Sequence, residues 1–401
     1  MSKKNNHFFK EKKPWSEAKD ELLGCYLRPY IQKVLNTRKP IVYVDCFAGK
    51  GVFEDGKPGS PLIALHTISD CLGKTKISRW TIQPFFIDLN YADDLRENLK
   101  DYGGIQVISG KYEEIIEELL SDKAGCNVFL YVDPYGIKAL SYRLFDAFSA
   151  SKKFNSIELL INMNSFGFIR EGCRVLGAVF DDESMFDDLV EYDSTRLEAN
   201  EKSMTALNEI AGGDYWKAII ESYKGNEITI YEAEAQFAAQ YCERLRHSYT
   251  YVLNMPLKIK RGQLPKYRMI HATNHVEGCL LMVDNICGRW ELMKEIQNNG
   301  QFQLWEENYE NEIVDDEDIR NKVISHISNF TCFVRLNLIL ADFFMKYGPI
   351  CSRKTVKDIY KGLVAQRKLD IRRNLQFTLT GRPSTFFTDE IGKIMELRWL
   401  S

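Results

Sequence analysis

Short apolar runs alternate with helical segments along the first 163 residues. Five runs of four to eight residues predict strands, namely Pro40–Cys46, Thr81–Ile87, Ile105–Ile108, Asn127–Val132 and Ser156–Met163. Apolar residues at helical spacing predict helices over about 16–36, 60–72, 91–102, 112–122 and 139–149. This alternation predicts an α/β fold, a Rossmann-like doubly wound and mainly parallel sheet with helices on both faces. Ser16 is the expected N-cap of the first helix.

The rest of the chain changes character twice. Residues 170–246 are mainly helical in pattern and predict an insertion, followed by strands over Thr250–Met255 and Tyr267–His271. An acidic run over 305–318 predicts a linker. Helices over about 334–347 and after Ser352, then β-prone runs at Phe377–Leu379 and Thr385–Thr388, predict a C-terminal winged-helix-like module. The expected domains are an arm and helix over 1–36, an α/β domain with the helical insertion over 37–300, an acidic linker over 301–329 and the module over 330–401.

Composition excludes several classes of protein. Apolar residues make up 45% and charged residues 27% of the 401-residue chain, as in ordinary globular proteins. No apolar run approaches the roughly 20 residues of a membrane-spanning helix, and no apolar segment typical of a secretion signal follows the N-terminus. The ten cysteines include no CxxC pair. We therefore expect reduced thiols, buried for the most part, in a cytoplasmic protein without a zinc ribbon or iron–sulfur cluster.

The first candidate site follows the first predicted strand. The motif is Asp45-Cys46-Phe47-Ala48-Gly49-Lys50-Gly51, whose glycines allow a tight turn and a close approach of ligand to backbone. Asp45 would repel a pyrophosphate but would attract a cation. The motif therefore favours S-adenosylmethionine, with Asp45, Phe47, Ala48, Gly49 and Gly51 as binding residues. The alternative is a tight turn without a ligand.

Two further strand ends extend this candidate cofactor site. Asp88 ends the second predicted strand, where a carboxylate can accept both ribose hydroxyls. The alternative role is a helix N-cap. Ser109-Gly110-Lys111-Tyr112 follows the third strand, where the adenine edge would lie, and makes Lys111 a weaker candidate.

The candidate catalytic motif is Asp133-Pro134-Tyr135-Gly136, after the fourth predicted strand. An exocyclic amine of a base is a poor nucleophile because its lone pair is delocalised into the ring. Asp133 and the carbonyl before or at Pro134 could accept hydrogen bonds from that amine and expose its lone pair, while Tyr135 stacks on the base. The alternative is a type I turn, which Asp-Pro also forms.

Taken together, these motifs resemble Class I S-adenosylmethionine-dependent methyltransferases that act on exocyclic amines of nucleic-acid bases. The sequence lacks the second proline of DPPY and is similar to the DP-aromatic-G form of tRNA guanine-N2 enzymes, so the target base stays open. A longer resemblance is to the three-Cys-motif partner family (TcmP). It is carried by Pro14-Trp15-Ser16 with Lys19 and Tyr26, by residues 43–51, 59–62 and 132–136, and by residues 267–275. That resemblance implies a bacterial two-component system with a three-cysteine, radical-SAM-like partner protein. It does not identify a catalytic residue in this sequence.

The remaining candidates are basic and histidine residues. Residues 351–373 carry eight Lys and Arg against two Asp. Phosphate binding would use Arg353, Lys354, Lys357, Arg372, Arg373 and, at the wing tip, Arg382. The alternative is a solvated helix face. His271 and His275 form HxxxH, but their spacing crosses from a strand to a helix, so we expect no metal site and a structural or substrate-facing role.

Three hypotheses follow. The first is a methyltransferase acting on an exocyclic amine of RNA or DNA, with the C-terminal module positioning the nucleic acid. The second is an inactive methyltransferase-fold scaffold that binds nucleic acid and a three-Cys partner protein. A small-molecule methyltransferase is less favoured because such a substrate has no need of residues 319–400.

Overall fold

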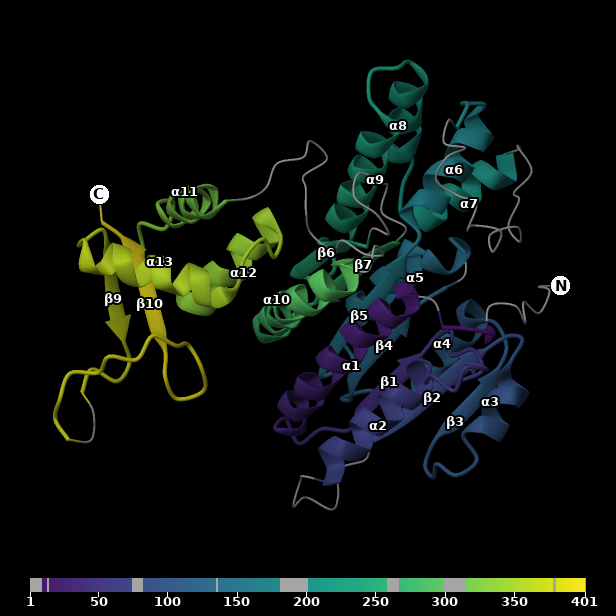
Figure 1. Cartoon of the computed structure of the whole chain (residues 1–401), viewed down its shortest axis with the longest axis horizontal. Coiled ribbons are helices and arrows are strands. Elements are labelled where there is room, and N and C mark those ends of the chain that lie inside the picture. Colours follow the sequence, from purple (N-terminus) through teal and green to yellow (C-terminus); the bar gives the residue numbers. More distant parts are fainter. Residues whose placement is uncertain are drawn as a thin grey trace. The chain divides into compact units, whose positions relative to one another are not determined.

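A computed structural model describes residues 9–12, 14–73, 82–134, 136–180, 201–257, 267–298, 315–377 and 380–400. The chain divides into two compact units (Figure 1). The N-terminal unit comprises Met1–Asn274 with Glu291–Leu304, and the C-terminal unit comprises His275–Trp290 with Trp305–Ser401. Each unit contains its own sheet.

The sheet of the N-terminal unit has seven strands in the order β3-β2-β1-β4-β5-β7-β6. Their bounds are β1 Ile41–Asp45, β2 Ile82–Asp88, β3 Gln106–Ser109, β4 Asn127–Val132, β5 Ser156–Met163, β6 Tyr251–Leu257 and β7 Tyr267–Thr273. Strands β1 to β5 pair in parallel, and β7 is antiparallel to both β5 and β6. The predicted α/β fold with a mainly parallel sheet is confirmed, and it is consistent with a Rossmann-like methyltransferase fold.

Helices connect these strands. Their bounds are α1 Pro14–Leu35, α2 Ser60–Gly73, α3 Ala92–Asn98, α4 Tyr112–Ser121, the short η2 Lys138–Leu140, α5 Tyr142–Ala150, α6 Ser165–Leu176, α7 Glu201–Ala211, α8 Tyr215–Lys224 and α9 Ile230–Leu245. Helices α6 to α9 confirm the mainly helical character of 170–246 over its described residues. The predicted N-cap of the first helix is wrong: α1 begins at Pro14, whose fixed φ suits the first helical turn, and Ser16 lies inside the helix.

Pro84 lies inside β2 without breaking the sheet. The register pairs Pro84 with Tyr43 of β1, whereas pairing with β3 begins only at Phe85. A proline cannot donate to a neighbouring strand, so it is tolerated where the strand has an open edge. At Pro84, β2 has a partner on one side only, which reconciles the proline with its place in the sheet.

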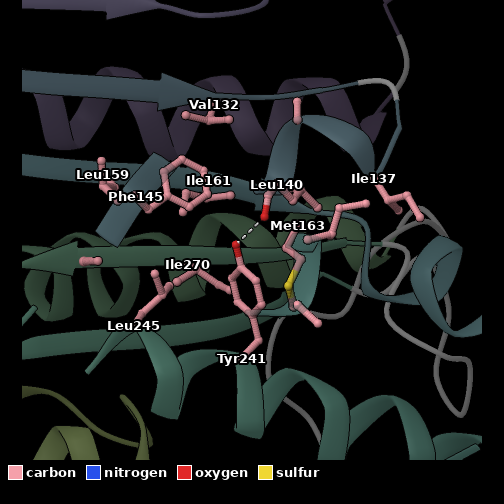
Figure 2. Packing of buried hydrophobic residues seen from close by; sticks show 14 of the residues in the cluster. Val132, Ile137, Leu140, Phe145, Leu159, Ile161, Met163, Tyr241, Leu245 and Ile270 are labelled. Atoms are coloured by element: carbon pink, nitrogen blue, oxygen red, sulfur yellow. Dashed lines mark hydrogen bonds between the residues drawn. The ribbon is translucent and has the colours of Figure 1, made fainter. Parts of the chain in front are cut away.

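The two-residue period of the strands divides the sheet into two faces. Val42 and Val44 of β1 pack into a large apolar cluster with Val128 and Leu130 of β4 and with α4 to α9. Figure 2 shows part of that cluster, in which Tyr241 of α9 donates its hydroxyl to the Leu140 carbonyl at 2.9 Å.

The opposite face lies against α1. Tyr30 of α1 packs on Phe129 of β4 with ring centroids 5.0 Å apart, and Phe129 stacks on Tyr43 of β1 at 6.0 Å. Asp45 and Asp133 continue the alternation of Tyr43 and Phe129 along their strands. Both carboxylates therefore belong to the α1 face, at the carboxyl ends of neighbouring strands.

The C-terminal unit contains most of α10, Val276–Asn298, followed by α11 Asp316–Ile327, β8 Val334–Arg335, α12 Leu336–Tyr347, α13 Arg353–Ala365, β9 Leu369–Arg373 and β10 Met395–Trp399. Its strands form an antiparallel sheet in the order β8-β10-β9. Helices after 334 and after Ser352 are confirmed, and Ser352 caps α13 by accepting from the Thr355 amide.

The strand predicted at Thr385–Thr388 is wrong, because those residues are irregular. The strands on either side of the turn are β9 and β10, whose residues Leu369, Met395 and Leu397 are buried. Phe377, in contrast, is 63% exposed. Local β-propensity at the turn is thus overridden by burial of the flanking runs.

All ten cysteines are free, and seven are buried, which confirms the expectation of mostly buried thiols. Within the described ranges, none of the helices combines the length and the apolar character needed to cross a bilayer.

Candidate active site

A pocket of about 680 Å³, counting the open solvent at its mouth, lies at the carboxyl ends of β1 and β4. The lining residues come from the N-terminal arm, α1, the turn after β1, the end of β4 and β7, and are Phe9, Ser16, Lys19, Asp20, Phe47, Ala48, Gly49, Gly51, Phe53, Gly59, Ser60, Asp133, Pro134 and Tyr267. The predicted turn and the predicted Asp-Pro motif therefore share one cavity.

The turn after β1 requires its glycines. Gly49 and Gly51 have φ of +62° and +78°, a region that side chains with a Cβ disfavour. A Cβ on Gly51 would lie 2.7 Å from the Leu95 side chain, and one on Gly49 would lie 3.0 Å from the ring of Phe9. The absence of side chains thus lets Leu95 of α3 and Phe9 of the arm pack against the turn.

Asp88 links this turn to the start of α3 through its two carboxylate oxygens. Its Oδ2 accepts from the Gly49 amide at 2.9 Å, and its Oδ1 accepts from the amides of Asn90 and Tyr91 at 2.8 and 2.7 Å. The residue is buried. In this arrangement the carboxylate holds the glycine turn and the start of α3 together, rather than presenting free oxygens to a ribose.

We expect Asp88→Ala to destabilise the protein by about 2–4 kcal/mol, because three backbone amides lose a charged acceptor. Urea denaturation measures the loss. Asp93→Ala, which removes an exposed carboxylate from α3, is the control and should change stability by no more than about 0.5 kcal/mol. Equal stability of the two variants would contradict the structural role of Asp88.

Asp45 is completely buried beside the pocket. Its Oδ1 accepts from the Phe47 amide at 3.2 Å, and its Oδ2 has no hydrogen-bond partner among the described residues. Burial raises the pKa of Asp45 to about 7, against the opposing effect of the Ser60 hydroxyl and the Phe47 amide. A buried acceptor of this kind is costly unless a ligand supplies a donor or a cation.

Asp133 is held by two side chains from other elements. Lys19 of α1 places Nζ 2.8 Å from Oδ1 and 2.7 Å from Oδ2, and Asn162 of β5 donates to Oδ1 at 2.6 Å. The Tyr131 hydroxyl lies farther away, 3.4 Å from Oδ2. Pro134 lines the pocket beside Asp133, and Tyr135 lies outside the described residues.

A second lysine–aspartate pair adjoins the first. Lys12 of the arm contacts Asp20 of α1 at 2.6 Å and also donates to the Pro58 carbonyl at 2.6 Å. Burial raises the pKa of Asp20 to about 6, although Lys12 and Lys19 lower it. Lysines therefore neutralise Asp20 and Asp133, and Asp45 is left as the carboxylate with an open oxygen.

Sequence reasoning missed the contribution of α1 to the site. Lys19 lies on the same helical face as Leu23, Tyr26 and Tyr30, all of which are buried. A lysine in an apolar stripe is the signal that could have found it, because a buried lysine requires a partner. Asn162 carries a similar signal, as a polar residue in an otherwise apolar run.

Lys111 does not join the pocket. It precedes α4 and forms an ion pair with Glu114 at 2.6 Å, with 57% of its side chain exposed. The pair spans one turn at the surface. Of the seven predicted cofactor residues, the pocket lining includes Phe47, Ala48, Gly49 and Gly51, while Asp45 and Asp88 support the turn.

His271 and Arg268 of β7 form contacts with other residues of the fold, which indicates a structural role. His271 is buried and its Nε2 lies 3.2 Å from Glu158 of β5, which also accepts from the Tyr26 hydroxyl of α1. Arg268, the other polar candidate, is paired with Glu234 at 2.6 Å. The described part of the chain contains no group of three or more His, Cys, Asp or Glu side chains placed to hold a metal ion. The Glu158 cluster fixes α1 on the sheet and so helps to place Lys19.

The predicted basic residues are distributed over three elements of the C-terminal unit. Arg353, Lys354 and Lys357 lie on α13, Arg372 and Arg373 on β9, and Arg382 in the turn. Several have partners within the unit: Arg353 contacts Asp284 at 2.6 Å, Arg372 contacts Glu396 at 2.5 Å, and Arg373 donates to the Phe386 carbonyl at 2.8 Å. Burial lowers the pKa of Lys357. Lys354 and Arg382 are exposed.

Comparisons with known proteins give few matches. No family model and no curated protein matches the chain. Among solved structures, it is similar to a crystal structure of a selenomethionine-substituted CurJ carbon methyltransferase, with 11% sequence identity and a TM-score of 0.29. The match covers 63% of this chain and 54% of that one. At this level the similarity carries no argument about activity.

Proposed function

We propose that this protein is an S-adenosylmethionine-dependent methyltransferase. The observation that carries the proposal is the buried Asp45 carboxylate, which has one oxygen without a partner among the described residues. It stands beside a pocket floored by Gly49 and Gly51. A carboxylate with an open acceptor suits the ammonium group of the methionyl moiety, and the glycine turn suits close approach of the ligand to the backbone.

The topology supports the same assignment. The strand order β3-β2-β1-β4-β5 changes direction between β1 and β4. Doubly wound sheets bind their ligands at such a point. The antiparallel β7 between β5 and β6 is typical of Class I methyltransferases. Pocket and topology point to the same edge of the sheet, namely the carboxyl end of β1.

For the acceptor, we propose an exocyclic amine of a nucleic-acid base. Asp133 lies in the same pocket, and Lys19 and Asn162 take both acceptor directions of its Oδ1. On Oδ2, Lys19 takes one direction, and the Tyr131 hydroxyl at 3.4 Å is a weak competitor for the other. Oδ2 is thus the atom that can accept from an amine N–H and so expose the nitrogen lone pair.

For the C-terminal unit, we propose a winged-helix-like module that positions the nucleic acid. Its order α11-β8-α12-α13-β9-β10, with β10 central in a three-stranded antiparallel sheet, supports this interpretation. Lys354 on α13 and Arg382 on the turn between β9 and β10 are exposed cations, and exposed cations are the side chains that contact phosphates. Membership of the TcmP family and docking of a three-Cys partner remain part of this proposal on the strength of the sequence motifs.

A second candidate function is an inactive scaffold of the same fold. It is favoured by one specific feature, the protein donors that already contact the two acids that a methyltransferase would use. Asp88 is bound by three backbone amides, and Lys19 contacts both oxygens of Asp133. Under this alternative, the protein binds its partner and nucleic acid without binding the cofactor.

Calorimetric titration of the purified chain with S-adenosylmethionine and S-adenosylhomocysteine separates the two functions. Micromolar binding supports the methyltransferase. Because a cationic ligand requires Asp45 to be ionised and its pKa is about 7, affinity should increase about tenfold per pH unit up to pH 7 and then level off. A folded protein without measurable binding would contradict the methyltransferase proposal and favour the scaffold.

A further inference from the structure

The contacts of Lys19 suggest more than helix packing. Its Nζ contacts both oxygens of Asp133 and lies 4.9 Å from the centre of the Tyr267 ring. The lysine side chain is 8% exposed and that of Asp133 is 22% exposed. The pair therefore lies at the pocket wall, with the carboxylate open to the cavity and the ammonium behind it.

Two acids of the pocket wall, Asp20 and Asp133, adjoin the buried Asp45. Asp20 of α1, Asp45 of β1 and Asp133 after β4 lie close enough for each of the first two to be affected by the charge of Asp133. Among the described residues, the charged and titratable groups that face this cluster include Lys12 of the arm, Lys19 of α1, Tyr43 of β1, Cys46 after β1 and Tyr131 of β4. Without Lys19, the negative charges of Asp20 and Asp133 would be balanced by Lys12 alone among these groups.

We propose that Lys19 is a positioning residue for methyl transfer, which holds the Asp133 carboxylate turned so that Oδ2 faces the acceptor amine. This inference rests on the proposed function. The ammonium and the Asn162 amide together fix the plane of the carboxylate, since they bind it from α1 and from β5. Orientation of a reacting group by a second residue is a general requirement of catalytic sites.

The role predicts that Lys19 acts on catalysis and leaves cofactor binding unchanged. Lys19→Met keeps an unbranched apolar stem of similar length and removes the charge. We expect its affinity for S-adenosylmethionine to stay within about threefold of wild type, while kcat/KM at pH 7 falls about 10- to 100-fold. The acid limb of the pH profile should move up by about one pH unit, because a cluster of carboxylates that has lost a cation retains protons to higher pH.

Two other variants complete the experiment. Lys19→Arg retains the cation and a bidentate contact, so it should restore the wild-type acid limb. Lys57→Met is the matched control, because Lys57 pairs with Glu17 of the same helix and both side chains are largely exposed. It should leave the profile unchanged. An unshifted acid limb in Lys19→Met with activity within threefold of wild type would overturn the proposal.

A measurement without turnover separates this inference from the proposed function. The carboxyl carbon of Asp20, labelled with 13C and assigned by Asp20→Asn, reports the charge balance of the cluster by NMR. Its pKa of about 6 is lowered by Lys19, so the titration should move to higher pH in Lys19→Met and not in Lys57→Met. An unmoved Asp20 titration overturns the role of Lys19, whether or not the protein binds S-adenosylmethionine.

Discussion

Asp45→Asn should abolish tight cofactor binding and at the same time stabilise the unliganded protein at neutral pH. The side chain keeps its shape and can still accept from the Phe47 amide. It loses the negative charge that would face the ligand's ammonium group. We expect an affinity for S-adenosylmethionine lower by about 100-fold or more, measured by calorimetry at pH 8.

The stability part of this prediction follows from the raised pKa. In the folded protein Asp45 retains its proton up to about pH 7, whereas in the unfolded chain it loses the proton near pH 4. The folded state thus binds more protons between these values, and its stability falls as pH rises from about 4 to 7. Asn has no proton to lose, so the variant should be more stable than wild type at pH 8, by about 2–4 kcal/mol.

Urea denaturation at pH 5 and pH 8 tests the sign. The two proteins should differ little at pH 5 and clearly at pH 8. Such a gain in stability with a loss of binding is expected when a binding site keeps a strained, destabilised group. A variant destabilised equally at both pH values would mean that the Asp45 carboxylate is a structural acceptor and not a ligand-binding group.

The alternation of strands carries much of what the sequence could predict. Apolar runs located β1 to β5 within about two residues, and a pocket lies where β1 and β4 end. The run at Thr385–Thr388 was wrongly predicted as a strand, because tertiary burial selected the strands that contain Leu369 and Leu397. Of the run predicted at Phe377–Leu379, residues 378 and 379 lie outside the described residues.

The partners of the acidic residues could not be predicted in the same way. Strand parity places Asp45, Asp133 and Asn162 on one face, but the lysine that contacts Asp133 is 114 residues away in sequence. Asp88 had the correct place at the end of β2, yet the turn after β1 supplies one of the amides that bind it. Both contacts depend on tertiary packing that no local pattern encodes.

Asp133→Ala should reduce methyl transfer by about 1,000-fold or more while cofactor affinity stays near that of wild type. The substitution removes Oδ2, the proposed acceptor for the amine N–H. Transfer of tritiated methyl groups from S-adenosylmethionine to bulk RNA, single-stranded DNA and duplex DNA measures the loss. Asp133→Asn keeps an acceptor oxygen and is the matched variant, with an expected loss of about 10- to 100-fold.

Alanine at 133 also leaves Lys19 without its carboxylate, so a loss of activity could reflect misfolding. We expect Asp133→Ala to lower the free energy of unfolding by about 2–3 kcal/mol. This loss is small for a broken buried ion pair because Asp20 still attracts Lys19. The double variant Lys19→Met with Asp133→Ala removes both charges and should recover much of that stability. If the stable double variant regained more than a tenth of wild-type turnover, Asp133 would not be the acceptor of the amine hydrogen bond, since alanine at 133 has no side-chain acceptor.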